Sequence, residues 1–203
     1  MKHSKGALDC SETLSKRIEA ARGHIECDMT IRNVHYLDVF SGKFIKGDVS
    51  IHQGIIVGID ETYSAREVVD GEGAYVVPGF IDAHVHIERS MMTPDRFEES
   101  VLACGTTSVI WDPHEIANVK GTAGIQWALD TSEKLALDVF VMVPSCVPST
   151  NTEMGFETSG AELRSDDLLK FRDHPRVLGL AEMMNFPGLL NGDSDILSKL
   201  TSY

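Results

Sequence analysis

The sequence predicts an α/β fold in which four strand–helix units follow one another along most of the chain. From residue 77 onward, apolar β-branched runs of strand length alternate with amphipathic runs of helical length. Before them, residues 29–77 hold only short β-rich runs separated by turn signals. The composition, 42% hydrophobic and 24% charged residues, is that of a globular protein.

The N-terminal third predicts a helix and then a small sheet. Leu14, Ile18, Ala21 and Ile25 recur at helical spacing within residues 11–25. The pairs that follow, Gly after Ser41, Gln53 or Asp70, indicate turns, so we expect an antiparallel sheet of hairpins. A sheet of about 50 residues is marginal as an independent core, and we expect it to pack against another part of the protein. The expected strands are residues 34–40, 48–52, 55–59, 68–69 and 75–77.

The rest of the chain predicts the first half of a (β/α)8 barrel, because four such units are half of eight. Thr93, Pro94 and Gly105 are typical of the start and end of the first expected helix. A half barrel leaves strand edges unpaired, so we expect this chain to be part of a longer protein. The expected strands are residues 77–86, 106–112, 138–145 and 177–183, and the expected helices are residues 94–104, 119–135, 165–171 and those from about 195.

Charge and composition exclude several classes of partner. Lys and Arg number 18 against 31 Asp and Glu, a net charge of −13, which repels nucleic-acid phosphates and anionic membranes. The sequence has no apolar run long enough to cross a membrane, and its first eight residues lack a signal-peptide core. The four cysteines, at no metal-finger spacing, do not indicate a disulfide framework. We therefore expect a cytoplasmic protein without nucleic-acid or membrane partners.

The most informative motif ends the first barrel strand. Asp82, His84, His86 and Glu88 alternate along it and are expected to share one face. Two imidazoles one strand period apart can bind one divalent ion, and the C-terminal end of a barrel strand is where such folds place catalysis. The alternative is two histidines satisfied by hydrogen bonds in the core. The preceding Pro-Gly-Phe-Ile-Asp run, residues 78–82, favours the metal.

A second polar cluster, Asp112, His114 and Glu115, ends the next strand. It falls at the same rim as His86, where its members would line a site. Asp112 and Glu115 are equally typical of a helix cap, and both interpretations stay open. His114 is the better site candidate, because imidazole both binds ligands and carries protons.

A third candidate, Glu182, ends the fourth strand. A carboxylate that finishes the apolar stripe of Leu178 and Leu180 is costly unless it is paired or bound to metal. Beside His84 and His86, it is positioned to bridge two ions. The alternative is a solvated residue just beyond the strand. Cys146, after the third strand, is expected to be a buried and inert thiol rather than a ligand or nucleophile.

The run from Val77 to His86 resembles the first-strand signature of the metal-dependent amidohydrolases. Five segments together resemble, more narrowly, the bacterial adenine deaminases, and the likeness extends from about Ala21 to the C-terminus. Arg89 departs from the pattern, since a serine is expected there. The five segments are residues 84–88, 90–94, 112–116, 145–148 and 179–184.

The resemblance implies a (β/α)8 barrel with a small β-sandwich built from N- and C-terminal segments. The implied organisation is an N-terminal helical segment (1–27), a β-sandwich segment (28–77) and the first half of the barrel (78–203). The resemblance also implies a binuclear divalent metal centre, with manganese expected and iron or zinc as alternatives. His84 and His86 match the first-strand ligands, and Glu182 matches the bridging carboxylate of the fourth strand.

The implied activity is hydrolytic deamination of adenine to hypoxanthine and ammonia, an aminohydrolase reaction on a cyclic amidine in purine salvage. Glu88, Asp112 and His114 are candidates for contact with the substrate, and Glu88 and His114 also for proton movement. We expect the full-length form to be a homo-oligomer. The family's later strands supply further histidines and an aspartate, so we expect little activity from this chain alone.

Two other functions stay open. The first is another cyclic amidohydrolase, of the dihydroorotase or hydantoinase kind. Those enzymes commonly bridge their metals with a carboxylated lysine on the fourth strand, whereas here that strand has Glu182 and no lysine. The second is a half barrel without catalytic activity that binds metal or pairs with another chain.

Overall fold

The computed structural model describes residues 11–59, 63–150 and 157–203 of the chain. It divides into two compact units between Pro78 and Gly79. Residues 1–10, part of the predicted N-terminal helical segment, lie outside the described residues.

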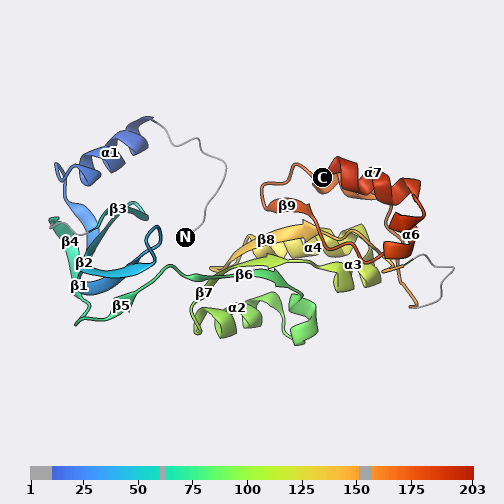
Figure 1. Cartoon of the computed structure of the whole chain (residues 1–203), viewed down its shortest axis with the longest axis horizontal. Coiled ribbons are helices and arrows are strands. Elements are labelled where there is room, and N and C mark those ends of the chain that lie inside the picture. Colours follow the sequence, from blue (N-terminus) through green and yellow to red (C-terminus); the bar gives the residue numbers. More distant parts are fainter. Residues whose placement is uncertain (1–10, 60–62, 151–156) are drawn as a thin grey trace. The chain divides into compact units, whose positions relative to one another are not determined.

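The first unit is a helix and one five-stranded sheet of order β3-β2-β1-β4, with β5 also paired to β1 (Figure 1). β1, β2 and β3 are antiparallel, as predicted for hairpins. The prediction of a wholly antiparallel sheet is wrong, because β4 and β5 run parallel to β1. After β3 the chain returns to the start of β1, where Ala65 pairs with Cys27, instead of reversing in a hairpin. The elements are α1 (Ser11–Ala21), β1 (Cys27–Asp38), β2 (Lys43–His52), β3 (Ile55–Ile59), β4 (Ala65–Asp70) and β5 (Tyr75–Val76).

The second unit contains the predicted parallel sheet. Its four strands lie in the order β6-β7-β8-β9, and every neighbouring pair is parallel (Figure 1). This arrangement confirms the predicted N-terminal portion of a (β/α)8 barrel. The strands are β6 (Phe80–Val85), β7 (Thr106–Trp111), β8 (Asp138–Val143) and β9 (Val177–Leu180).

The helices of this unit differ from the prediction in two places. The single helix expected over residues 119–135 is wrong, because two helices, α3 and α4, meet at Gly121, whose φ of 60° is left-handed. The helix expected over residues 165–171 is an α-helix only as far as Leu168, and Arg164 is its N-cap. The elements are η1 (Ile87–Ser90), α2 (Pro94–Leu102), α3 (His114–Lys120), α4 (Thr122–Ser132), α5 (Ser165–Leu168), η3 (Leu169–Phe171), α6 (Phe186–Leu190) and α7 (Ser194–Ser202).

The two faces of this sheet have different environments. On β8, Val139, Val141 and Val143 are fully buried in the clusters that also contain Ala128 and Leu129 of α4. The alternate residues of β8 point to the opposite face, as the period of two requires. The side chains on that opposite face are only partly buried. The polar residues at the ends of the strands follow next in the chain.

Close packing of α3 on α4 gives a stability prediction. A Cβ on Gly124 would lie 2.5 Å from the backbone oxygen of Ile116. We expect Gly124→Ala to lower the free energy of unfolding by about 1–3 kcal/mol, the usual cost of overpacking. Gln126→Ala, on the exposed side of the same helix, is the control and should stay within about 0.5 kcal/mol of the wild type. Urea denaturation of both variants is the measurement, and equal midpoints would contradict the packing argument.

Other features of the described residues bear on the sequence predictions. Cys27, Cys104 and Cys146 form no disulfide, and Cys10 lies outside the described residues. Cys146 is 4% exposed, as expected for a buried thiol. In the described part of the chain, no helix combines the length and apolarity that a membrane crossing needs.

Candidate metal centre

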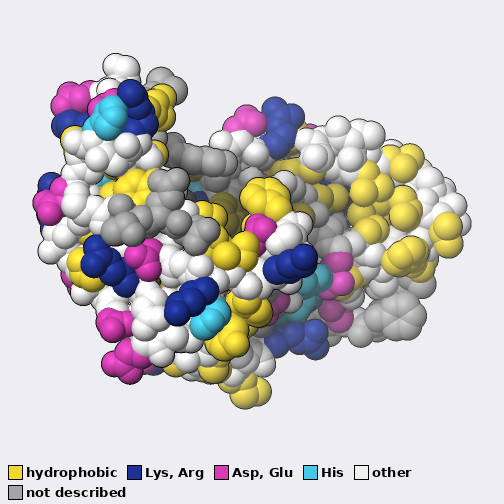
Figure 2. Space-filling model, turned by 60° about the vertical axis from the view of Figure 1, so that its left-hand side comes forward, with side chains coloured by type: hydrophobic (Ala, Val, Ile, Leu, Met, Phe, Trp, Pro, Cys, Tyr) yellow, Lys and Arg dark blue, Asp and Glu magenta, His cyan; other side chains and the backbone are white. Residues whose placement is uncertain are grey.

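Polar side chains from three strand ends converge in the second unit. His84 lies on β6, and His86 follows that strand's last residue. Asp112 directly follows β7, and Glu182 lies two residues beyond β9. One donor atom from each of the four residues lies within 4.8 Å of the others. In the space-filling view, histidine (cyan) and acidic (magenta) side chains adjoin on the face shown (Figure 2).

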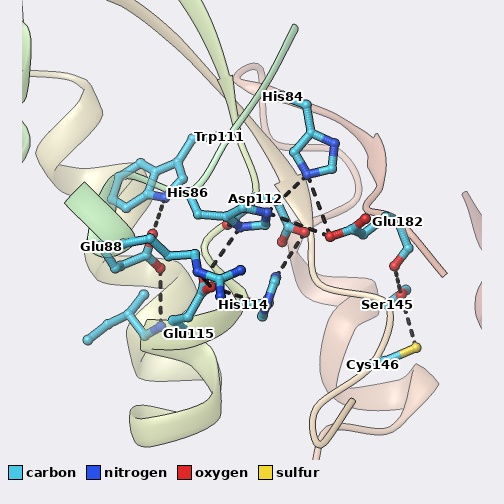
Figure 3. Close-up of polar contacts among 12 residues, drawn as sticks. His84, His86, Glu88, Trp111, Asp112, His114, Glu115, Ser145, Cys146 and Glu182 are labelled. Atoms are coloured by element: carbon cyan, nitrogen blue, oxygen red, sulfur yellow. Dashed lines mark hydrogen bonds and ion pairs between the residues drawn. The ribbon is translucent and has the colours of Figure 1, made fainter. Parts of the chain in front are cut away.

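The two imidazoles and the glutamate surround one small space (Figure 3). The Nε2 atoms of His84 and His86 are 3.1 Å apart, and Oε1 of Glu182 is 3.6 Å from each of them. Nδ1 of His86 lies 2.9 Å from the backbone oxygen of Asp112, so a neutral ring donates its proton there. That bond leaves Nε2 of His86 without a proton and turned toward His84 and Glu182. Nitrogen and carboxylate donors in this arrangement suit a divalent cation.

Asp112 has an oxygen without a partner. The residue is only 2% exposed, and its Oδ2 accepts a hydrogen bond from Nδ1 of His114 at 3.1 Å. Its Oδ1 is buried and has no hydrogen-bond partner among the described residues. A buried carboxylate oxygen without a partner is costly in free energy. The residues present therefore fit a bound cation, which would satisfy this oxygen.

A second cluster adjoins the first and shares His86 with it. His86, His114 and Glu115 also bring donor atoms within 4.8 Å of one another. The Glu115 carboxylate lies 3.3 Å from Nδ1 of His86, 3.4 Å from Nε2 of His114 and 3.3 Å from Nε of Arg89. Burial lowers the pKa of His114, but the Asp112 hydrogen bond and the carboxylates of Glu115 and Glu182 outweigh it and raise the pKa above its usual value.

Neither Asp112 nor Glu115 caps the helix that follows them. The N-cap of α3 is Pro113, and no side-chain cap bond is present at that position. Instead, Oε1 of Glu88 accepts the backbone N–H of Ile116 at 3.1 Å (Figure 3). Neither residue is therefore a helix cap, and both belong to the clusters of donor atoms at the strand ends, while their role in a site stays a prediction.

Glu88 does not share a strand face with His84 and His86, so that expectation is wrong. β6 ends at Val85, and Glu88 lies on the 3-10 helix η1, where the period of two no longer applies. Its Oε2 accepts the indole N–H of Trp111 at 2.7 Å. Burial raises the pKa of Glu88, and its hydrogen bonds only partly offset that effect. No pattern in the sequence indicates that Trp111 and the Ile116 amide are its partners.

These two bonds give a prediction for Glu88. Glu88→Ala leaves the Trp111 indole and the Ile116 amide without their acceptor, so we expect unfolding to require about 1–3 kcal/mol less. The matched control is Glu99→Ala on α2, whose exposed carboxylate pairs with exposed Arg96. Chemical denaturation followed by tryptophan fluorescence measures both variants. If the two variants are equally stable, Glu88 does not hold η1 and α3 together.

A cavity of about 150 Å³ lies beside the first cluster. His84, Asp112 and Glu182 form its polar wall, and apolar residues of β6, β7, β8 and the β9 end form the remainder. At about 30 Å³ for each water, it has room for a few water molecules next to the candidate ligands. Its apolar wall consists of Ala83, Ile110, Met142 and Ala181.

Comparison with known proteins places these residues in a family context. Residues 75–200 match the amidohydrolase family. A protein from Desulfatibacillum aliphaticivorans named adenine deaminase is 46% identical over 185 residues, which cover 91% of this chain and 32% of the relative. An adenine deaminase from Bacillus velezensis is 47% identical over 189 residues, covering 93% of this chain and 32% of the relative. The chain thus spans about a third of the length of the curated relatives it matches.

Solved structures support the fold. Atrazine chlorohydrolase from Arthrobacter aurescens, in complex with zinc, aligns with a TM-score of 0.57 at 17% identity, over 79% of this chain and 48% of that chain. A triazine hydrolase from the same organism aligns with a TM-score of 0.55 at 18% identity, over 75% of this chain and 45% of that chain. At such low identities the likeness concerns the fold alone.

Proposed function

Because this chain belongs to the amidohydrolase family, we propose that it carries metal-binding residues of a hydrolase that deaminates adenine to hypoxanthine and ammonia. The observation that carries the proposal is the convergence of His84, His86, Asp112 and Glu182 at the C-terminal ends of parallel strands. The choice of adenine rests on the relatives at 46% and 47% identity that are named adenine deaminase.

The proposed cofactor is a binuclear divalent centre, with manganese preferred over iron or zinc. His84 and His86 would hold it through Nε2, and the Glu182 carboxylate would bridge. The equal distance of 3.6 Å from Oε1 of Glu182 to both imidazoles supports a place for this carboxylate beside them at one of the ions. When bound, such cations act as Lewis acids that make water a nucleophile near neutral pH.

The remaining residues are proposed to handle substrate and protons. Asp112 and His114 form a hydrogen-bonded pair at the rim, between Oδ2 of Asp112 and Nδ1 of His114. We assign this pair to substrate contact, and His114 to proton movement as well. The bonds of Glu88 to Trp111 and Ile116 favour a positioning role, in which it orients the start of α3, rather than direct contact with adenine.

The cellular setting is proposed from the same resemblance. With adenine as the substrate, the proposed role of the reaction is purine salvage. The proposed location is the cytoplasm, and the proposed full-length form is a homo-oligomer. The net charge of −13 supports a small-molecule substrate rather than a nucleic acid, because an acidic surface repels phosphates.

A chimera tests the function. Residues 1–203 replace the matching third of the Bacillus velezensis relative, with which they share 47% identity. With Mn²⁺ added, we expect the chimera to convert adenine to hypoxanthine at about 1 per second or faster, within the usual range of enzymes. Adenine absorbance and ammonia release measure the rate.

Residues 1–203 alone are the comparison arm. We expect no turnover from them, since the described residues supply four of a barrel's eight strands. A chimera that folds and binds Mn²⁺ but leaves adenine unchanged would overturn the adenine proposal. If that chimera instead opened a cyclic amide such as dihydroorotate, the alternative amidohydrolase function would replace it.

A further inference from the structure

Glu182 lies beyond the regular sheet, so its position needs another explanation. β9 ends at Leu180, and the last sheet-like bond runs from the Ala181 N–H to the oxygen of Val143 at 2.8 Å. The Glu182 side chain is 46% exposed, and its distances to the imidazoles, 3.6 Å, exceed a hydrogen bond. These ion pairs are longer than hydrogen bonds, so the position of the backbone contributes to where the carboxylate lies.

Two consecutive residues after β8 hold that backbone. The Ser145 hydroxyl, in a residue 1% exposed, donates a hydrogen bond to the backbone oxygen of Glu182 (Figure 3). The Cys146 sulfur accepts the backbone N–H of Asn185 at 3.2 Å. Both ends of residues 182–185 are thus attached to one buried dipeptide.

The hydrogen count of this arrangement is consistent. Oγ of Ser145 also lies 3.1 Å from Sγ of Cys146, but a serine hydroxyl has one proton to donate. Because the Ser145 hydroxyl donates this proton in its hydrogen bond to the Glu182 oxygen, the Cys146 thiol is the donor in its own contacts. It donates either to Ser145 Oγ or to Sδ of Met183 at 3.4 Å. Each group then has a partner, so the buried dipeptide is a satisfied network.

The far end of the segment is also anchored. Oδ1 of Asn185 accepts the N–H of Gly188 at 3.0 Å and caps α6. The segment that carries Glu182 is therefore held between the end of β8 and the start of α6. Loss of the contacts of Ser145 or of Cys146 would remove an attachment between residues 182–185 and the chain that follows β8.

We propose that Ser145 and Cys146 are positioning residues that hold the Glu182 carboxylate within reach of His84 and His86. This inference rests on the proposed role of Glu182 as a metal ligand. Neither the buried serine nor the buried thiol contacts an imidazole. The inference is that both nevertheless affect the affinity of the centre for metal. Residues that orient metal ligands typically change affinity by about 10–100-fold when they are replaced.

The test is Co²⁺ binding to the chimera that joins residues 1–203 to the remaining part of the Bacillus velezensis relative, measured by isothermal titration calorimetry and by the visible absorption of bound Co²⁺. We expect Ser145→Ala to weaken binding by about 10-fold or more. The matched control is Ser132→Ala, which removes another fully buried hydroxyl and its bond to the oxygen of Ala128. A general loss of stability would affect both variants alike, whereas positioning predicts weaker Co²⁺ binding for Ser145→Ala only.

A second pair of variants covers the case in which Ser145→Ala does not fold. Cys146→Ala removes the acceptor of the Asn185 amide, and Cys146→Ser restores an acceptor, so the serine variant should bind Co²⁺ more tightly than the alanine variant. If the wild type and all folded variants bind Co²⁺ equally, positioning is overturned while the metal site stands. If the chimera without substitutions folds but binds no Co²⁺, both this inference and the metal site of the proposed function fail.

Discussion

Replacement of His84 or His86 by alanine is expected to abolish deamination in the chimera and to lower its metal content. Each imidazole supplies one nitrogen donor to a cluster of four donor residues. The other imidazole, 3.1 Å away, already supplies its own nitrogen to the ion and cannot replace the one that is lost. We expect activity to fall by more than about 100-fold, since even residues that only orient ligands cost about 10–100-fold. Steady-state rates and elemental analysis of the purified variants measure the effect.

The control separates ligand loss from misfolding. The His84 side chain is 48% exposed, so its removal should change stability by less than about 0.5 kcal/mol. His24→Ala removes a similarly exposed imidazole from the first unit and should leave both activity and metal content unchanged. Full activity and undiminished metal in His84→Ala would rule out its role as a ligand.

The second large effect is expected for Glu182→Gln. The amide keeps the size of the side chain but loses the negative charge, so it bridges two cations poorly. We expect one of the two ions to be lost before the other. Activity should fall as the number of bound ions per chain drops below two. Dialysis of the chimera followed by metal analysis measures the number of ions per chain.

A matched carboxylate provides the comparison for Glu182. Glu99→Gln, on the exposed side of α2, changes the charge by the same amount and should retain both ions. Two tightly held ions together with normal turnover in Glu182→Gln would show that this carboxylate does not bridge.

Much of the barrel unit could be predicted because its signals are local. The β-branched run at β7 and the continuous apolar run at β8 mark buried parallel strands directly, and the strand-end positions of Asp112 and Glu182 follow from them. The helix break at Gly121 is harder to predict from the sequence. A glycine inside a helical pattern breaks the helix when its φ is positive, and the sequence does not reveal that angle.

The remaining features depend on contacts between distant residues. Nothing near residues 60–65 indicates that β4 returns beside β1 rather than beside β3. The position of Glu88 depends on the Trp111 indole, 23 residues away, and that of the Glu182 backbone on Ser145, 37 residues away. Such partners are determined by tertiary packing, which periodicity does not describe.

The central claim is that His84, His86 and Glu182 hold a divalent metal ion. Anomalous diffraction from crystals of the chimera grown with Mn²⁺ tests it most directly, because the peak locates the ion without reference to activity. We predict a peak within about 2.5 Å of Nε2 of His84 and His86, a typical metal–ligand distance. A metal peak elsewhere, with these imidazoles still hydrogen-bonded to each other, would contradict the account.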